Sequence, residues 1–164
     1  MSINSLLSDR FIRERSLGNV DMDADTFKVI LMDSSFKYLP ASHGTLSDVT
    51  SHQIATGNGY TQNNKTLTGV NIGTGSPSTI TWNDVTWTAS GGSIGPVGGM
   101  VIYDDTHAND IVMGCCDFGQ DYTVPDGQDF ELRDISLEVN RDPSRDTITT
   151  TTTTSSTTTT TTAP

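Results

Sequence analysis

The chain has 164 residues, of which 33% are hydrophobic and 18% charged, and its formal net charge is −11. This length fits one ordinary domain, and a low apolar content with 15 glycines is more typical of a small, turn-rich β-protein than of a helical one. The acidic balance argues against nucleic-acid binding, because neutralising phosphates requires clustered lysine and arginine. The sequence lacks a signal-peptide pattern and an apolar run of bilayer length, so we expect cytosolic synthesis and no membrane association.

The first predicted element is a short amphipathic helix from Ser5 to about Arg15, with Gly18 as its stop. Its apolar side should cover part of the core or a neighbouring subunit, because so short a helix is not stable alone in water. Three of the nine basic residues lie in it, namely Arg10, Arg13 and Arg15. This positive end could dock on another acidic protein surface, and a solvated helix face is the alternative.

The next predicted strand, Asp25 to Met32, is apolar on both faces, which favours a central position in a sheet. Asp33 to Gly59 shows no sustained period and is expected to be a long surface excursion. A further strand is predicted over Thr66 to Ile72. A turn from Gly73 to Ser78 should then lead into a strand from Thr79 to Trp82.

Val85, Trp87 and Ala89 alternate with polar residues, which predicts a half-buried strand with Trp87 in the core. Trp82 is ambiguous, and a sugar-stacking platform would require both tryptophans to face outward. The glycine run from Gly91 to Gly99 lacks the Gly-Lys-Ser/Thr ending of a phosphate-binding loop, so we interpret it as a flexible connection between strands.

Two short apolar runs, Met100 to Tyr103 and Ile111 to Met113, predict buried strands joined by a polar hairpin loop from Asp104 to Asp110. Cys115 and Cys116 follow. Neighbours in a strand point to opposite faces and a disulfide between them would be strained, so free buried thiols are expected.

The last predicted strand runs from Phe130 to Val139, after a tight turn at Asp126-Gly127. Its apolar residues change parity midway, which indicates a β-bulge near Arg133-Asp134. The sequence therefore predicts a mainly β fold, an antiparallel β-sandwich of the jelly-roll or immunoglobulin-like kind. It has a short N-terminal helix and an extended threonine-rich C-terminal tail.

Little catalytic chemistry is visible in the sequence. His43, His52 and His107 lie far apart in polar loops, and no Gly-x-Ser-x-Gly elbow occurs. Six aspartates in two loops could supply oxygen ligands for calcium, although turn formation explains them equally well. These are Asp104, Asp105, Asp110, Asp121, Asp126 and Asp129. We expect no enzyme, metal or cofactor.

Residues 142–164 form a tail that is almost wholly threonine and serine after residue 148. We therefore divide the chain into an N-terminal helix and arm (1–24), a sandwich domain (25–141) and this tail. A threonine strand has no face to bury, so we expect its backbone to hydrogen-bond to other chains. The candidate partner contacts in the tail are Thr151, Thr154 and Thr157.

Several stretches resemble a family of small virion proteins of tailed bacteriophages. They are Asp25–Met32, Ile54–Thr61, Asn83–Ala89, Met100–Asp105, Cys116–Gly119 and Asp126-Gly127. The resemblance covers about residues 1–140. The chain departs from the family at Cys115-Cys116, at Gly98-Gly99 and in its longer tail. The family provides no catalytic residues to transfer.

The resemblance implies a non-enzymatic structural component of a virion. We expect a capsid decoration or cement protein that binds the major capsid protein or other virion proteins on the outer shell, as a homo-oligomer and preferably a trimer. One alternative is a tail, neck or fibre protein, and another is a carbohydrate-binding adhesin module. Copy number in the particle would distinguish a decoration protein from a tail, neck or fibre protein. Glycan binding by the isolated domain would identify an adhesin module.

Overall fold

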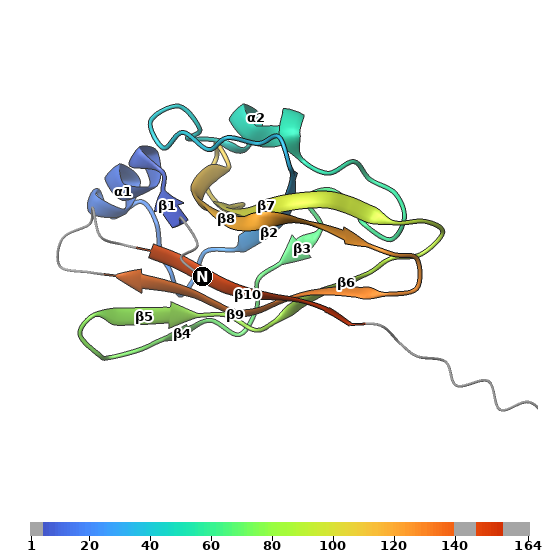
Figure 1. The fold of residues 1–164 in the computed structure, drawn as a ribbon. Helices are drawn as coiled ribbons and strands as arrows, with labels where there is room; N and C mark the ends of the chain where they lie inside the picture. The colour runs from blue at the N-terminus through green and yellow to red at the C-terminus, as the bar shows by residue number, and fades with distance from the viewer. Residues whose placement is uncertain (1–4, 140–146, 156–164) are drawn as a thin grey trace, which may run out of the picture.

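The computed structural model describes residues 5–139 and 147–155, which form two antiparallel sheets packed as a β-sandwich (Figure 1). The elements are β1 (Ser5–Leu7), α1 (Asp9–Ser16), β2 (Phe27–Asp33), α2 (Leu46–Val49), the 3-10 helix η1 (Thr50–His52), β3 (Lys65–Thr66), β4 (Asn71–Ile72), β5 (Ser78–Thr81), β6 (Val85–Thr88), β7 (Ile94–Asp104), β8 (Ile111–Val124), β9 (Asp129–Val139) and β10 (Thr147–Ser155). The predicted mainly β sandwich is therefore confirmed.

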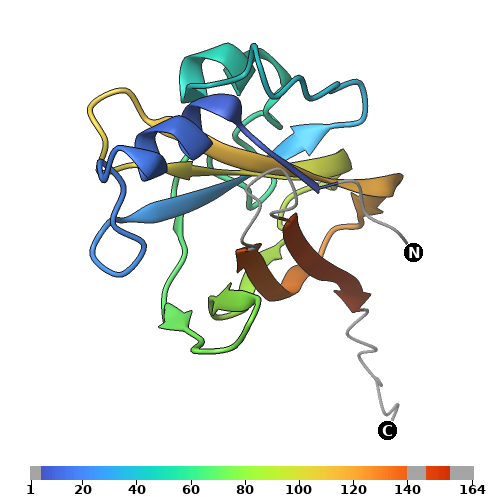
Figure 2. The ribbon, with the colours of Figure 1, turned by 90° about the vertical axis from the view of Figure 1, so that its left-hand side faces the viewer.

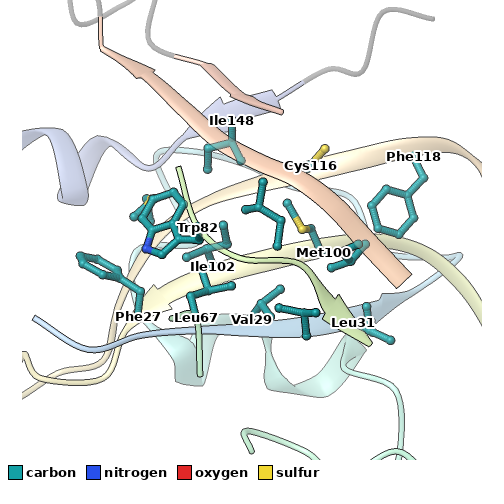
Figure 3. Close-up of a cluster of buried hydrophobic side chains, with 14 of the residues drawn as sticks. Phe27, Val29, Leu31, Leu67, Trp82, Met100, Ile102, Cys116, Phe118 and Ile148 are labelled. Carbon is teal, nitrogen blue, oxygen red and sulfur yellow. The ribbon is translucent and has the colours of Figure 1, made fainter. Parts of the chain in front are cut away.

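Sheet 1 has the strand order β1-β8-β7-β2-β3, and sheet 2 has the order β10-β9-β5-β4, with β6 also pairing with β9. The main core lies between the sheets, where the longer strands contribute alternate side chains (Figure 3). Phe27, Val29 and Leu31 of β2 face this core together with Ile102 of β7 and Ile148 of β10. β2 lies between β7 and β3, so its predicted central position is confirmed.

The segment from residue 33 to residue 59 is more than the surface excursion that we expected. It carries α2 and η1 and covers the outer face of sheet 1, as Figure 1 shows. A second buried cluster lies beneath it, built from Ile30, Met32, Val49, Val101, Tyr103, Val112 and Cys115. Its apolar residues contact a sheet surface that is itself apolar, so they need no regular period of their own.

The first helix begins later than predicted. Ser5–Leu7 pairs with β8 as strand β1, and α1 starts at Asp9 after the N-cap Ser8, whose Oγ accepts the Phe11 N–H at 3.2 Å. The backbone groups of β1 form hydrogen bonds with the edge of β8. An extra helical turn would not satisfy these groups any better. Gly18, with a φ of 76°, follows the helix as predicted.

Two other predictions about strand boundaries are wrong. Residues 66 to 72 do not form one strand, because the chain leaves sheet 1 after β3 and joins sheet 2 at β4, with Gly69 at a φ of 66° between them. Gly98 and Gly99 belong to strand β7 and not to a flexible connection. A Cβ on Gly99 would lie 2.8 Å from the Cys116 carbonyl oxygen, so close approach of the strands requires glycine there.

Other predictions for the sandwich agree with the structure, although β8 continues to Val124, well beyond the predicted run from Ile111 to Met113. Residues 105–110 connect β7 to β8, one residue later than the predicted start at Asp104, and Gly127, with a φ of 77°, lies in the turn before β9. The bulge occurs at Asp134, which has a φ of 53° and lies where the pairing of β9 with β10 skips one residue. Cys115 and Cys116 are reduced thiols, not joined in a disulfide, and are buried on opposite faces of sheet 1.

The threonine tail differs most from expectation. Its described part, β10, pairs antiparallel with β9 of the same chain, from Thr147 opposite Glu138 to Ser155 opposite Asp129. Ile148 is fully buried, and Thr150 is buried with its hydroxyl bonded to the Arg133 carbonyl. The boundary that we placed at 141/142 therefore separates β10 from a sandwich to which it belongs. A threonine pattern carries no signal for which strand it will pair with.

Candidate functional site

The arginines of α1 are spread over different surroundings. Arg10 packs against Gly44 of the 33–59 segment, since a Cβ on Gly44 would lie 3.2 Å from the Arg10 Cβ. The Arg15 guanidinium lies 5.8 Å from the centroid of the Phe11 ring, where a cation and an aromatic face attract each other. Arg13 is exposed. The expected positive patch is therefore centred on Arg13.

Electrostatic interactions within α1 also explain the presence of its arginines, and no partner protein is needed for this explanation. Asp9 lies in the first turn, and Arg13 and Arg15 lie in the last turn, so each charge opposes the helix dipole. A hydrogen bond from the Asn19 amide lowers the pKa of Glu14, and the neighbouring Arg13 lowers it further. The solvated-face interpretation thus accounts for these arginines, and docking on a partner stays a prediction.

The candidate contacts in the tail lie on β10, where neighbouring side chains point to opposite faces of sheet 2. Thr151 is opposite Arg133 on the outer face and is exposed. Thr154 is also exposed but is opposite Phe130, so it lies on the inner parity of the strand. Thr157 lies outside the described residues. Thr151 and Thr154 therefore share a strand edge but not a face.

The α1 helix and β10 lie on different sides of sheet 1, as Figure 2 shows. α1 packs against β8, whereas β10 pairs with β9. The arginines of α1 and the threonines of β10 consequently do not form one surface. Each set would contact a different partner, or a different copy of the same partner.

A cluster of polar and aromatic side chains on the 33–59 segment was not predicted. The Phe36 ring stacks on His43 at a centroid distance of 5.4 Å and lies 5.6 Å from His52. Nδ1 of His43 accepts the Leu39 N–H at 3.0 Å. These residues are spread over the segment without a motif, so the sequence offers no signal that brings them together.

The same cluster contains a serine, a histidine and an aspartate in contact, but in the wrong geometry for catalysis. The Ser35 hydroxyl donates to Asp33 Oδ1 at 2.6 Å. Both Ser35 Oγ, at 3.3 Å, and Asp33 Oδ2, at 3.5 Å, lie against the same His52 nitrogen, Nδ1. In a catalytic triad the histidine bridges the other two residues through its two nitrogens. Here the Ser35 hydroxyl donates its hydrogen bond to Asp33, so His52 is not placed to activate it as a nucleophile.

The electrostatics of Asp33 fit a structural role. Burial alone raises the pKa of this carboxyl, but the hydrogen bonds from Ser35 and the neighbouring His52 outweigh it and lower the pKa overall. Asp33 also accepts the Ser35 backbone N–H at 2.7 Å. The group therefore stays ionised and fixes the start of the segment that covers sheet 1.

An open cleft of about 540 Å³ lies beside this segment, between it and the β7–β8 part of sheet 1. Gly98 and Gly99 line it together with Phe36 and Tyr38, and three acidic side chains surround them, namely Asp33, Asp117 and Asp121. Two of these carboxylates already accept hydrogen bonds in their own loops, Asp33 from Ser35 and Asp117 from Gly119. Two of the three carboxylates of the cleft are therefore engaged in their own loops, which leaves fewer polar groups to fix a small ligand.

The calcium alternative gains no support. Within residues 5–139 and 147–155, no group of three or more histidine, cysteine or acidic side chains could hold a metal ion. Gly91 donates its N–H to Asp126, and Thr88 donates its hydroxyl to Asp129. These aspartates stabilise turns and strand ends, in agreement with the turn-forming interpretation of the sequence.

The burial of both tryptophans is inconsistent with a sugar-stacking platform. Trp82 and Trp87 are 6% and 2% exposed, and Trp82 contacts Phe27 edge to face at 6.1 Å. A stacking platform needs an exposed ring face.

In the described part of the chain, no helix has the length and apolar character that a membrane crossing requires.

Asp104, one of the proposed calcium ligands, is fully buried at the end of β7. Its Oδ1 accepts the N–H groups of Thr106 and His107 at 2.9 and 3.2 Å, while Oδ2 has no hydrogen-bond partner among the described residues. Burial raises the pKa of Asp104, against the effect of the two hydrogen bonds and with the help of the negative Asp25. The folded state therefore disfavours the ionised carboxyl more than the unfolded state does.

We expect Asp104→Asn to raise the melting temperature by a few degrees at neutral pH. The raised pKa means that Asp104 contributes stability in acid and loses that contribution as pH rises through the folded-state pKa. Asparagine keeps an acceptor for Thr106 and His107 and removes the buried charge. Thermal melts should show the gain shrinking in acid. Asp23→Asn, which makes the same charge change at an exposed position, should lack this pH-dependent gain. Equal or lower stability of Asp104→Asn at neutral pH would contradict the argument.

No protein-family model, no curated protein and no solved structure matches this chain.

Proposed function

We propose that the chain is a non-enzymatic structural component of a bacteriophage virion, a capsid decoration protein that joins the outer shell as an oligomer. The virion setting rests on the sequence resemblance. The structural support comes from one observation, the long strand β10, which forms an edge of sheet 2 and has no paired strand on its outer side within the described residues. Such an edge offers main-chain hydrogen bonds to another chain.

The use of polar side chains in the described region supports an assembly role over an enzymatic one. Ser35, His52 and Asp33 are in contact, yet their protons are not arranged for nucleophilic attack. Asp33 and Asp117 accept backbone N–H groups of their own loops, and Asp126 accepts the Gly91 N–H of a neighbouring turn. What remains available for function is surface, namely the exposed Arg13 on α1 and the β10 edge.

Purified particles from a strain that produces the chain give the direct test. We expect the chain to co-sediment with intact particles in a density gradient and to be present in many copies, which quantitative mass spectrometry measures. Electron cryomicroscopy should then place its density on the outer shell. A small symmetric copy number at one vertex or on the tail would instead support a tail, neck or fibre protein. Absence from washed particles, with the chain recovered in the soluble fraction, would contradict the virion role.

A further inference from the structure

The edge of β10 stands out among the strand edges that the structure describes. β10 has 9 residues, whereas β1, β3, β4 and β6, which also lie at sheet margins, have 3, 2, 2 and 4. Natural sheets commonly avoid unwanted edge pairing by keeping edge strands short or by placing lysine and proline on them. The short margins here follow that rule, and β10 does not.

The sequence of β10 also lacks the usual obstacles to pairing. From Thr147 to Ser155 it contains threonine, one isoleucine and serine, with no charge, proline or glycine. The rest of the chain carries the whole net charge of −11, so β10 is a neutral edge on an acidic body. Two such edges can meet without placing like charges directly opposite each other.

The half of β10 that is free to pair runs from Thr151 to Ser155. β10 also contacts β1 and β8, and the Ile148 side chain in its first half lies over Gly114. Thr151 and Thr154 in the second half are exposed. No described strand other than β9 pairs with any part of β10.

We propose that the outer edge of β10 pairs antiparallel with β10 of a second copy of the chain, across a two-fold axis near Thr152 and Thr153. Sheet 2 then continues from one copy into the other. An identical strand fits because antiparallel two-fold pairing sets the same residues against each other on both sides. A different peptide would need pockets that read its side chains, and Thr151 to Thr154 offer only threonine side chains on the two faces of the strand.

This inference names the partner of the edge on which the proposed function rests, and it implies a two-fold unit in place of the trimer that the sequence led us to expect. Mass in solution tests it separately from the virion role. A chain that is monomeric in solution yet present in particles overturns the β10 pairing alone. A dimer that is absent from particles overturns the virion role alone.

Two neighbouring proline substitutions, Thr152→Pro and Thr153→Pro, test the edge itself. N–H groups of consecutive strand residues point to opposite sides, so one proline removes a donor towards β9 and the other removes a donor from the outer edge. Sedimentation equilibrium of the full chain should give the dimer mass. The outer-edge proline should shift it to the monomer mass with little change in melting temperature, whereas its neighbour should lower the melting temperature.

Single cysteines placed in turn from Thr151 to Thr154 locate the axis. In an antiparallel two-fold pair, disulfide cross-linking between copies should peak at one position and fall at its neighbours, because the residue at the axis faces its own copy. The native thiols are buried and give a low background. A monomer at the highest soluble concentration overturns the proposal. A dimer that persists in the proline variant with the unchanged melting temperature, or equal cross-linking at all four positions, overturns it as well.

Discussion

Truncation of the chain after Arg145 is expected to destabilise the whole sandwich, although the sequence had suggested that the tail is separable. The cut removes β10, which covers one side of β9 and inserts Ile148 between the sheets. Ile148 is fully buried and packs over Gly114 of β8. Loss of β10 therefore opens the core to water along one margin of the sandwich.

The size of this effect follows from the buried side chain and the lost pairing. Removal of a large buried aliphatic side chain typically costs about 2–5 kcal/mol, against about 5–15 kcal/mol for the stability of a whole domain. The truncation also leaves the inner residues of β9, Leu132 and Leu137, without the cover of their neighbours on β10. We expect most of the domain's stability to be lost.

Chemical denaturation followed by tryptophan fluorescence measures the change. A chain that ends after Ser155 keeps β10 and is the control for shortening as such. Ile148→Ala should reproduce part of the loss, while Thr149→Ala, which changes an exposed residue of the same strand, should cost less than 1 kcal/mol. A chain truncated after Arg145 that unfolds at the same denaturant concentration as the full chain would show that β10 is dispensable.

The second large effect is expected for Trp87→Ala, which should lower the free energy of unfolding by about 3–5 kcal/mol. Trp87 is 2% exposed and lies between Tyr60 and Phe130, with ring centroids 6.1 and 6.2 Å away. The Lys65 ammonium lies 5.7 Å from its ring. Alanine removes this centre of an aromatic cluster that joins β6, β9 and the 59–61 region, so cavity formation adds to the lost burial.

A second substitution separates packing from polar effects. The Trp87 Nε1 group is buried and has no hydrogen-bond partner among the described residues, so Trp87→Phe loses volume without breaking a hydrogen bond. It should therefore cost less than Trp87→Ala. Thr86→Ala, at the exposed neighbouring position, is the matched control. If Trp87→Ala melts within a few degrees of the parent, the placement of Trp87 in the core is wrong.

The alternation of apolar residues determined much of the sandwich without any tertiary information. Val85, Trp87 and Ala89 share one parity and are all buried, because a strand with one face on the core must place its apolar side chains on that face. The change of parity in the last strand located the bulge at Asp134 for the same reason. These features depend on which side chains are buried, and the alternation of apolar and polar residues along the sequence indicates this directly.

The functional surfaces depended much less on local sequence. His43 and His52 meet at Phe36 because the covering segment folds back on itself, and no spacing in the sequence indicates that contact. Arg10, Arg13 and Arg15 were recognised as a cluster, yet the packing of Arg10 on Gly44 and of Arg15 on Phe11 gives them separate surroundings.

The composition of the tail determined that it would be extended, since branched Cβ atoms favour strands and threonine was abundant. The tertiary structure decided which strand it joins. A run of identical threonines fits any register and either face, so its pairing is selected by the partner. Here the open side of β9 and the space that Ile148 fills over Gly114 make that choice, and both are assembled from residues far away in the sequence.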